Sequence, residues 1–259
     1  MQLSSLLKRA FSAPSKKPRY KIRLRRWPLL GEGFESKVHR AKLISRTSLV
    51  KKKKTHIALR RLRTPSCTKA EGLRDRAKLI NAKRVWREFR ASGLPVASFF
   101  VPVLRRGSKE YLSVIMENLR ARYGKIIPIN CNTYSPAPVF LKRLNVKRDL
   151  PLIKNLAGDY AKMVNLGYAP HYVDFWAFYK SRKGTNYERI IVDIYNIYKG
   201  ETELVQSTLN NLAIINNHLG KEENTQFLAF FLSTLRDKTL AKDIERGIGN
   251  GYLATNYEE

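Results

Sequence analysis

The stretch LLGEGFESKVHRA, residues 29–41, decides how the first half of the chain is interpreted. It holds Gly31 and Gly33 one residue apart, with Ser36 and Val38 at further fixed offsets. A glycine-rich turn between two strands exposes backbone N–H groups that can wrap a phosphate, because glycine removes the side-chain obstruction. Glycines are also common in ordinary tight hairpins. The segments that follow must therefore decide between the two interpretations.

The composition is that of a globular protein with a strong excess of basic residues. The chain has 259 residues, with 50 Lys or Arg against 21 Asp or Glu, and a formal net charge of +29. The electrostatic field of so large a positive charge attracts polyanions whatever the fold. Nucleic acid, an anionic membrane surface or glycolipid, and phosphorylated substrates are therefore all candidate partners. No apolar run approaches the roughly 20 residues of a spanning helix. We therefore expect no transmembrane segment.

The cysteines and histidines give no sign of a metal site. Cys67 and Cys131 lie far apart without metal-ligand spacing, which favours a reducing compartment and argues against a disulfide framework. His39, His56 and His218 show no pairing typical of a metal centre or a nucleophile triad. We leave these three histidines without a role.

Residues 1–27 form a basic N-terminal arm, since no acidic residue precedes Glu32. Its apolar residues at helical spacing are Leu3, Leu6, Leu7 and Phe11. This pattern would let a short amphipathic helix lie on an anionic surface. A frayed basic terminus is an alternative interpretation of this segment, and we favour it slightly over the amphipathic helix. An organelle transit peptide is the third interpretation.

The first half of the chain is predicted to be mainly β-sheet with one long helix. Strand patterns occupy residues 21–30, 36–45, 55–62 and 111–119. The segment 68–91 has the charge density and period of a helix, with Leu79, Val85 and Phe89 among its expected buried positions. We expect the run Lys51–Lys54 to be a solvated turn.

Beyond Asn118 the pattern becomes mainly helical. A proline-rich connector, Pro128–Pro138, is followed by helical segments around residues 139–144, 150–166 and 203–245. Two β-like runs between them, FWAFYK and RIIVDIYNI, are expected to form a hairpin whose turn contains Gly184. The sequence therefore predicts an α+β fold.

The order of motifs after the glycine-rich stretch strengthens the phosphate-binding interpretation. Ile57–Arg60 lies where the protein-kinase fold carries a strand cation, and Glu88 lies on the succeeding helix. A cation held by a helix carboxylate can orient the α- and β-phosphates of a nucleotide. The run VIMENL, which contains Glu117, is typical of a strand entering a hinge between lobes. Taken alone, Glu88 would be a surface carboxylate.

Two aspartates in the second half complete the requirement for phosphoryl transfer. Asp174 ends the run HYVD, and Asp193 closes the second short strand in IIVD. Phosphoryl transfer needs one carboxylate to receive or orient the attacking hydroxyl and another to hold Mg2+. Taken singly, Asp174 has the character of a cap or turn residue and Asp193 that of a strand-end carboxylate.

In this order the motifs resemble the lipopolysaccharide core kinases, which phosphorylate Kdo or heptose. The matching stretches are ALRRLR, WREFRASGLPV, RRGSKEYLSVIMENL, LGYAPHYVDFWAFY and IIVDIYNIYKG, and they run from about Leu29 to Gly200. RIO kinases and aminoglycoside phosphotransferases share the general outline. The resemblance implies a protein-kinase-like two-lobed fold, with a β-rich lobe at 28–118 and a helical lobe at 119–259.

The resemblance also implies a site. Members of that branch use ATP and Mg2+, act on a sugar hydroxyl, and are cytoplasmic or peripheral at the inner membrane. The implied cofactor-binding residues are Gly31, Gly33, Ser36, Val38, Ala58 and Glu117. Arg60 and Glu88 would orient the phosphates, Asp174 would be the catalytic base, and Asp193 would be the metal ligand.

The sequence departs from the family pattern at three points. Arg60 replaces the usual lysine, and Lys51 could occupy that strand if the hairpin is shorter. Tyr179 falls near the position of the asparagine that binds a second metal, and the histidine–aspartate triplet is one residue longer than usual. A catalytically impaired, pseudokinase-like module that binds nucleic acid or a protein partner through its basic surface is therefore the alternative hypothesis.

An aromatic cluster follows Asp174 and has two interpretations. Its members are Phe175, Trp176, Phe178 and Tyr179. They could form a platform for a sugar or a lipid beside the catalytic loop. At strand spacing such residues are more often core, and we favour the core interpretation.

Overall fold

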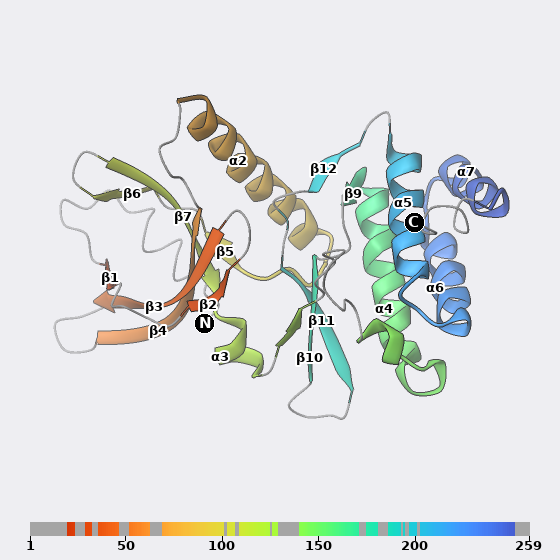
Figure 1. Ribbon diagram of the computed structural model, residues 1–259, viewed down its shortest axis with the longest axis horizontal. Helices are drawn as coiled ribbons and strands as arrows, with labels where there is room; N and C mark the ends of the chain where they lie inside the picture. The colour runs from red at the N-terminus through yellow and green to blue at the C-terminus, as the bar shows by residue number, and fades with distance from the viewer. Residues whose placement is uncertain are drawn as a thin grey trace. The chain divides into compact units, whose positions relative to one another are not determined.

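The computed structural model describes the backbone of residues 20–23, 29–32, 36–46, 52–62, 69–100, 103–106, 109–124, 126–128, 140–170, 175–180, 186–192, 194, 197–200 and 203–251. Side chains are described for residues 77–98, 117–119, 122–124, 140–170, 175–180, 186–192, 194, 197, 199–200 and 203–251. The chain divides into two compact units (Figure 1). The first comprises Met1–Lys83 and Ala97–Arg122, and the second comprises Arg84–Val96 and Tyr123–Glu259.

The first unit is built on an antiparallel sheet. Its strands are β1 (Tyr20–Arg23), β2 (Leu29–Glu32), β3 (Ser36–Arg46), β4 (Lys52–Leu62), β5 (Phe99–Phe100), β6 (Val103–Arg106) and β7 (Lys109–Glu117). The order across the sheet is β1-β3-β4-β7-β5, with β2 paired to β3 and β6 paired to β7. Strand β1 lies within the segment expected to be a basic arm, so part of that segment belongs to the sheet.

The prediction of a solvated turn at Lys51–Lys54 is wrong for its last three residues. Strand β4 begins at Lys52, which is paired with Arg46 of β3. The β3–β4 ladder is continuous over 11 residue pairs. Each added pair satisfies backbone hydrogen-bonding groups, and this gain outweighs the low strand propensity of lysine.

The long helix expected in the first half is α2 (Lys69–Ala91). Leu79, Val85 and Phe89 are buried, as its apolar period predicts. The helix ends at Ala91 and is followed by a turn in which Gly93 has a φ of 78°. Glycine adopts this left-handed conformation without a steric penalty, and it lets the Leu94 N–H donate to the Phe89 carbonyl at 2.9 Å.

The second unit combines small sheets with helices. One sheet has the order β11-β10-β8, from β8 (Ile126–Pro128), β10 (Trp176–Lys180) and β11 (Tyr187–Ile191). A second pairs β9 (Tyr168–Pro170) with β12 (Ile197–Lys199). The helical elements are α3 (Leu119–Tyr123, which crosses the boundary of the units), η1 (Leu141–Arg143), α4 (Val146–Asn165), α5 (Leu204–Asn216), α6 (Lys221–Thr234) and α7 (Lys238–Gly249). The mixed helix and strand content agrees with the α+β prediction.

The expected hairpin is present as β10 and β11. Its register runs from Lys180 opposite Tyr187 to Trp176 opposite Ile191, and the turn with Gly184 lies outside the described residues. The hairpin is attached to α4 by an ion pair in which the partly exposed Arg189 donates to the buried Asp159 carboxylate at 2.8 and 2.9 Å. Burial raises the pKa of Asp159, and the two hydrogen bonds from Arg189 oppose this rise. The pair therefore offsets part of the cost of burying this carboxylate.

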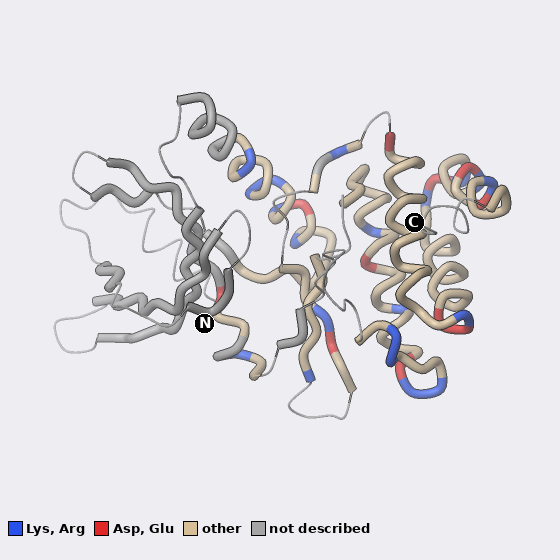
Figure 2. Tube along the Cα trace, viewed as in Figure 1, with Lys and Arg blue, Asp and Glu red and all other residues tan. Residues whose placement is uncertain are grey.

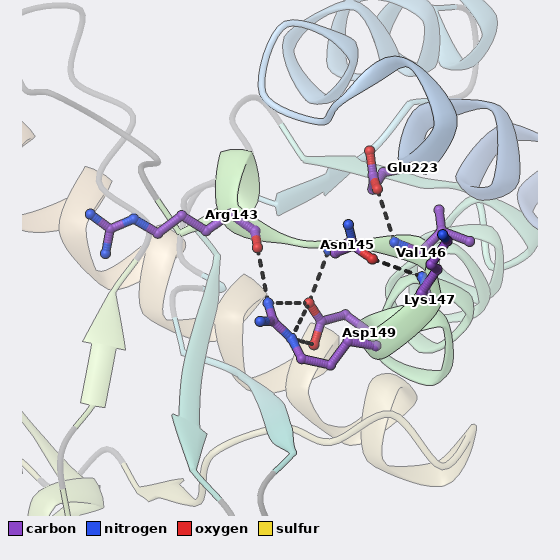
Figure 3. A network of polar contacts seen from close by, with 7 residues as sticks. Arg143, Asn145, Val146, Lys147, Asp149 and Glu223 are labelled. Carbon is purple, nitrogen blue, oxygen red and sulfur yellow. Dashed lines mark hydrogen bonds and ion pairs between the residues drawn. The ribbon is translucent and has the colours of Figure 1, made fainter.

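Helix α4 begins four residues earlier than the sequence predicts, because its first turn is capped by polar side chains (Figure 3). The Asn145 side chain accepts from the Lys147 N–H at 3.0 Å, and Glu223 of α6 accepts from the Val146 N–H at 2.9 Å. These bonds satisfy N–H groups that have no partner within the helix.

Asp149 completes the same network. Its carboxylate accepts from the Asn145 N–H at 3.0 Å and from the Arg148 guanidinium at 2.7 Å. Arg148 also donates to the Arg143 carbonyl at 3.0 Å. Burial opposes ionisation of Asp149, but the bonds from Arg148 and Asn145 outweigh it, and the pKa of Asp149 is lowered.

We expect Arg189→Leu to destabilise the protein by about 3–5 kcal/mol, because it leaves the Asp159 carboxylate buried without its partner. Adding Asp159→Leu should recover most of that loss, since the buried charge is then gone as well. Urea unfolding measures both effects. Arg246→Leu removes an exposed pair with Asp243 at 3.5 Å and serves as the control, with an expected change within about 0.5 kcal/mol. Equal losses in Arg189→Leu and Arg246→Leu would contradict the importance of the buried pair.

We expect Asp149→Asn to lower stability at neutral pH by about 1.5–3 kcal/mol, the range for hydrogen bonds to charged groups. Because the folded-state pKa of Asp149 is lowered from 3.8, its contribution is present above that pH and is lost as the pH falls through the folded-state value. The difference between wild type and variant should therefore shrink below about pH 4. A difference that stays constant from pH 7 to pH 2 in urea titrations would exclude this role.

Candidate functional site

The glycine-rich stretch lies in a β-hairpin, as its sequence predicts. Strands β2 and β3 pair with Gly31 opposite Val38, and the register shifts between Leu29 and Gly31. Ser36 is the first residue of β3, whereas Gly33 lies outside the described residues. The structure thus describes the two paired strands on either side of residues 33–35, which themselves lie outside the described residues.

Several predicted cofactor-binding residues share neighbouring positions in the sheet. Val38 is opposite Gly31 on one side and opposite Arg60 on the other, so these three residues form one row across β2, β3 and β4. Ala58 lies two residues before Arg60 on β4 and is opposite Met116 of β7. The backbone topology therefore brings these positions together.

Glu117 ends β7, and its carboxylate is engaged locally. It accepts from the Arg122 guanidinium and from the Ser98 N–H, the latter at 3.3 Å. The Glu117 N–H donates to the Ser98 carbonyl at 2.8 Å. These bonds tie the end of β7 to the segment that precedes β5. In the structure the Glu117 side chain therefore holds the backbone in place.

Glu88 forms an ion pair that the sequence did not suggest. Its carboxylate lies 3.4 Å from the Lys199 ammonium of β12, and both side chains are partly exposed. The Arg60 side chain lies outside the described residues, so the expected pairing of Arg60 with Glu88 stays a prediction. The stretch IIVDIYNIYKG contains Lys199, but its spacing gave no reason to single this residue out.

The aromatic ring of Tyr168, on β9, lies next to the same ion pair. The Lys199 ammonium is 5.3 Å from the centre of the Tyr168 ring, and Phe89 of α2 packs edge-on against that ring at 5.3 Å. Burial, and after it the neighbouring Glu88 carboxylate, raises the pKa of Tyr168 to about 12. Glu88, Tyr168 and Lys199 thus form one electrostatic cluster within the second unit.

Asp174 and Asp193, the predicted base and metal ligand, lie outside the described residues. Their chain neighbours Phe175 and Val192 are described, and the Val192 N–H donates to the Phe175 carbonyl at 2.8 Å. This bond continues the β10–β11 register by one step beyond Trp176 and Ile191. The Ile191 N–H also donates to the Pro95 carbonyl at 2.8 Å, which fixes this end of the hairpin.

The aromatic cluster is mainly core, as favoured from the sequence. Phe175, Trp176 and Phe178 are at most 1% exposed. Tyr179 is the exception, since its ring stacks on Tyr123 at 4.0 Å and its hydroxyl donates to Glu188 at 2.8 Å. The Tyr179 hydroxyl is therefore hydrogen bonded to a carboxylate on the neighbouring strand.

Within the described residues, no group of His, Cys, Asp and Glu has the arrangement of a metal site. His218 takes part in no such group, and its pKa is lowered by burial and by the charge of Lys142. Among the helices of the described segments, none has both the length and the apolar character to cross a bilayer.

Basic residues recur along the described segments (Figure 2). Exposed examples in the second unit are Arg84, Arg87 and Arg90 of α2, Lys142 and Arg143 of η1, and Lys147 and Arg148 of α4. The acidic residues beside the start of α4, Asp149 and Glu223, are buried within the capping network. Their charges therefore face inward while the basic side chains remain at the surface.

No protein-family model matches the chain, and no curated protein matches it.

We expect Glu88→Gln to lower the pKa of Tyr168 from about 12, because the nearby carboxylate disfavours the phenolate. The Lys199 ammonium, left without its partner, would act in the same direction. Titration of 13C-labelled tyrosines by NMR measures the change, with Tyr168→Phe to assign the signal. Glu203→Gln, at an exposed acidic position before α5, is the matched control. An unchanged Tyr168 titration in Glu88→Gln would show that the cluster is not electrostatically coupled.

Proposed function

We propose that this chain is an ATP- and Mg2+-dependent phosphotransferase that acts on a sugar hydroxyl of a lipopolysaccharide-core-type glycolipid at the cytoplasmic membrane face. The protein-kinase-like two-lobed fold is part of the same proposal. The observation that carries it is the register at the open end of the β10–β11 hairpin. The glycine hairpin and the row formed by Gly31, Val38 and Arg60 provide independent support.

The hairpin register supports a shared site for the two aspartates. Phe175 and Val192 are joined by a backbone hydrogen bond of 2.8 Å. Asp174 and Asp193 are each one peptide bond from a member of this pair. The strand pairing and the covalent geometry together therefore limit the distance between their Cα atoms to about 13 Å, since consecutive Cα atoms are about 3.8 Å apart and paired ones about 5.5 Å. A Cα separation within this limit is compatible with two carboxylates that serve one reaction.

Each residue has a distinct role in the proposed reaction. When bound, ATP and Mg2+ supply the phosphoryl group and neutralise the charge on its phosphates. Asp193 provides a carboxylate oxygen, the ligand type that Mg2+ prefers. Asp174 orients the acceptor hydroxyl and accepts its proton. Arg60 supplies a fixed positive charge, and the backbone around Gly31 and Gly33 offers N–H groups to the phosphates.

The alternative proposal is a catalytically impaired module whose basic surface binds nucleic acid or a protein partner. Two observations favour it. Glu88 is paired with Lys199 in the structure, and the hydroxyl of Tyr179 is engaged by Glu188. A neutral phenol bonded to a carboxylate offers little to a second Mg2+. The two proposals differ in their nucleotide chemistry.

We expect ATP with Mg2+ to raise the melting temperature of the wild type, and ATP with EDTA to have little effect. At a hundredfold excess over Kd, binding stabilises a protein by about 2.7 kcal/mol. Asp193→Ala should lose the Mg2+-dependent part of the shift. Asp174→Ala should keep the shift but lower phosphoryl transfer by about a hundredfold or more, the range for general base catalysis.

Asp243→Ala, which removes a partly exposed carboxylate from α7, is the matched control and should behave as wild type. Absence of any nucleotide response in the wild type would reject the phosphotransferase and favour the binding module. Nucleotide stabilisation without transfer to a glycolipid acceptor would retain the nucleotide site and reject the proposed substrate class.

A further inference from the structure

The exposed face of helix α4 carries positive charge and no exposed carboxylate. Its exposed residues are Lys147, Arg148, Pro151, Lys154, Asn155 and Lys162. The two acidic residues of the helix, Asp149 and Asp159, are at most 6% exposed, and each is paired with an arginine. The helix therefore separates its charges, with the carboxylates inside and the ammonium groups outside.

Three lysines of this face form what we call the lysine stripe. Lys147, Lys154 and Lys162 follow one another at intervals of about two helical turns, so their side chains lie on the same side of the helix. The stripe is about 22 Å long, since each residue of an α-helix advances about 1.5 Å. Lys142 and Arg143 of η1, which precedes the helix, are exposed as well.

The charges of the lysine stripe are not neutralised by ion pairs within the described part of the chain. None of the ion pairs found there includes a lysine of the stripe. The Lys154 ammonium lies 4.3 Å from the centre of the Phe230 ring, a contact that leaves its charge in place. The charge of Lys162 also reaches Asp159, but both hydrogen bonds to that carboxylate come from Arg189. The stripe therefore keeps positive charge for an external anion.

The chemistry of the stripe favours a surface of many phosphates over a single anion. Its ammonium groups are spread along a helix and do not converge on one point, and each is a compact charge without the planar fork of arginine. Among the described residues, the one exposed large apolar side chain is Ile80, which belongs to another helix. The stripe thus offers charge, and offers neither an apolar surface for insertion between lipids nor a ring for stacking on bases.

We propose that the lysine stripe is a docking surface for an anionic lipid bilayer. The attraction is electrostatic, because lipid phosphates form a plane of negative charge and each basic residue near it strengthens binding about fivefold. The choice of a bilayer over nucleic acid rests on the proposed function, in which the acceptor glycolipid lies in a membrane. The stripe itself stands on the exposed side chains of α4.

Vesicle binding tests the surface without any assumption about activity. The wild type should bind phosphatidylcholine vesicles that contain phosphatidylglycerol, and should bind vesicles of phosphatidylcholine alone only weakly. The triple variant Lys147→Gln, Lys154→Gln, Lys162→Gln should lose about a hundredfold in affinity for the anionic vesicles. Arginine at the same three positions should retain that affinity, because the charge is kept.

Helix α7 and the residues just before it offer a matched control. Arg236, Lys238 and Lys242 are exposed, and the exposed acidic residues Asp237 and Glu245 lie among them. Glutamine at these three basic positions removes the same formal charge and should lower vesicle affinity less than about fivefold, the effect of a single basic residue. Thermal unfolding checks that both glutamine triples are folded. Equal losses of affinity in the two triples would overturn the stripe, as would the absence of vesicle binding by the wild type.

Binding to RNA distinguishes the two classes of polyanion. At matched ionic strength, the glutamine triple on the stripe should lose far more affinity for anionic vesicles than for a single-stranded RNA, which the other basic residues of the chain can still attract. An equal loss for vesicles and RNA would overturn the assignment of the stripe to a bilayer.

Phosphoryl transfer separates this inference from the proposed function. The glutamine triple on the stripe should act on a water-soluble sugar acceptor at the wild-type rate, and should be about tenfold or more slower on a glycolipid acceptor embedded in anionic vesicles. Wild-type rates on the embedded acceptor would overturn the docking role. No turnover of either acceptor by the wild type would reject the proposed function, while the vesicle comparison would still decide the docking surface.

Discussion

The second unit depends on the buried contact between Asp159 of α4 and Arg189 of β11. A carboxylate that is 2% exposed is tolerated because both of its oxygens are hydrogen bonded. A slip of the hairpin by one residue would turn Arg189 to the opposite face of the sheet and leave the carboxylate without its partner. The ion pair therefore selects one register, and this register brings Phe175 and Val192 together. The proposed site follows from the placement of that pair.

Much of the fold could be predicted because its signals are local. The apolar period of α2 and the β-like composition of the runs FWAFYK and RIIVDIYNI each determine an element within one stretch of chain. Two failures had a tertiary cause. The lysines at the start of β4 are strand because β3 continues beside them, and the beginning of α4 depends on Glu223, which is 77 positions away in sequence from Val146. Neither partner can be inferred from the segment itself.

The candidate site, like the fold, could be predicted only where its signals are local in the sequence. The strand patterns predicted that Val38 and Arg60 belong to successive strands, with Gly31 in the turn before them, and the register puts all three in one row. They did not identify Lys199, because a lysine at the end of a strand is common in any chain. Its significance comes from Glu88, which only the folded chain brings near. Sequence order can thus locate candidate reactive groups more easily than the residues that orient them.

The environment of Tyr179 limits how the proposed chemistry could work. The resembled kinases carry an asparagine near this position for a second metal, whereas here the phenol bonds to Glu188 and stacks on Tyr123. Because both the hydroxyl and the ring are engaged in packing β10 against its neighbours, this position contributes to the stability of the hairpin. In the proposed reaction, Mg2+ would then be held by the carboxylate of Asp193, and Arg60 would supply the remaining positive charge. We therefore expect the charge of Arg60 to matter more for the proposed activity than it would in a two-metal site.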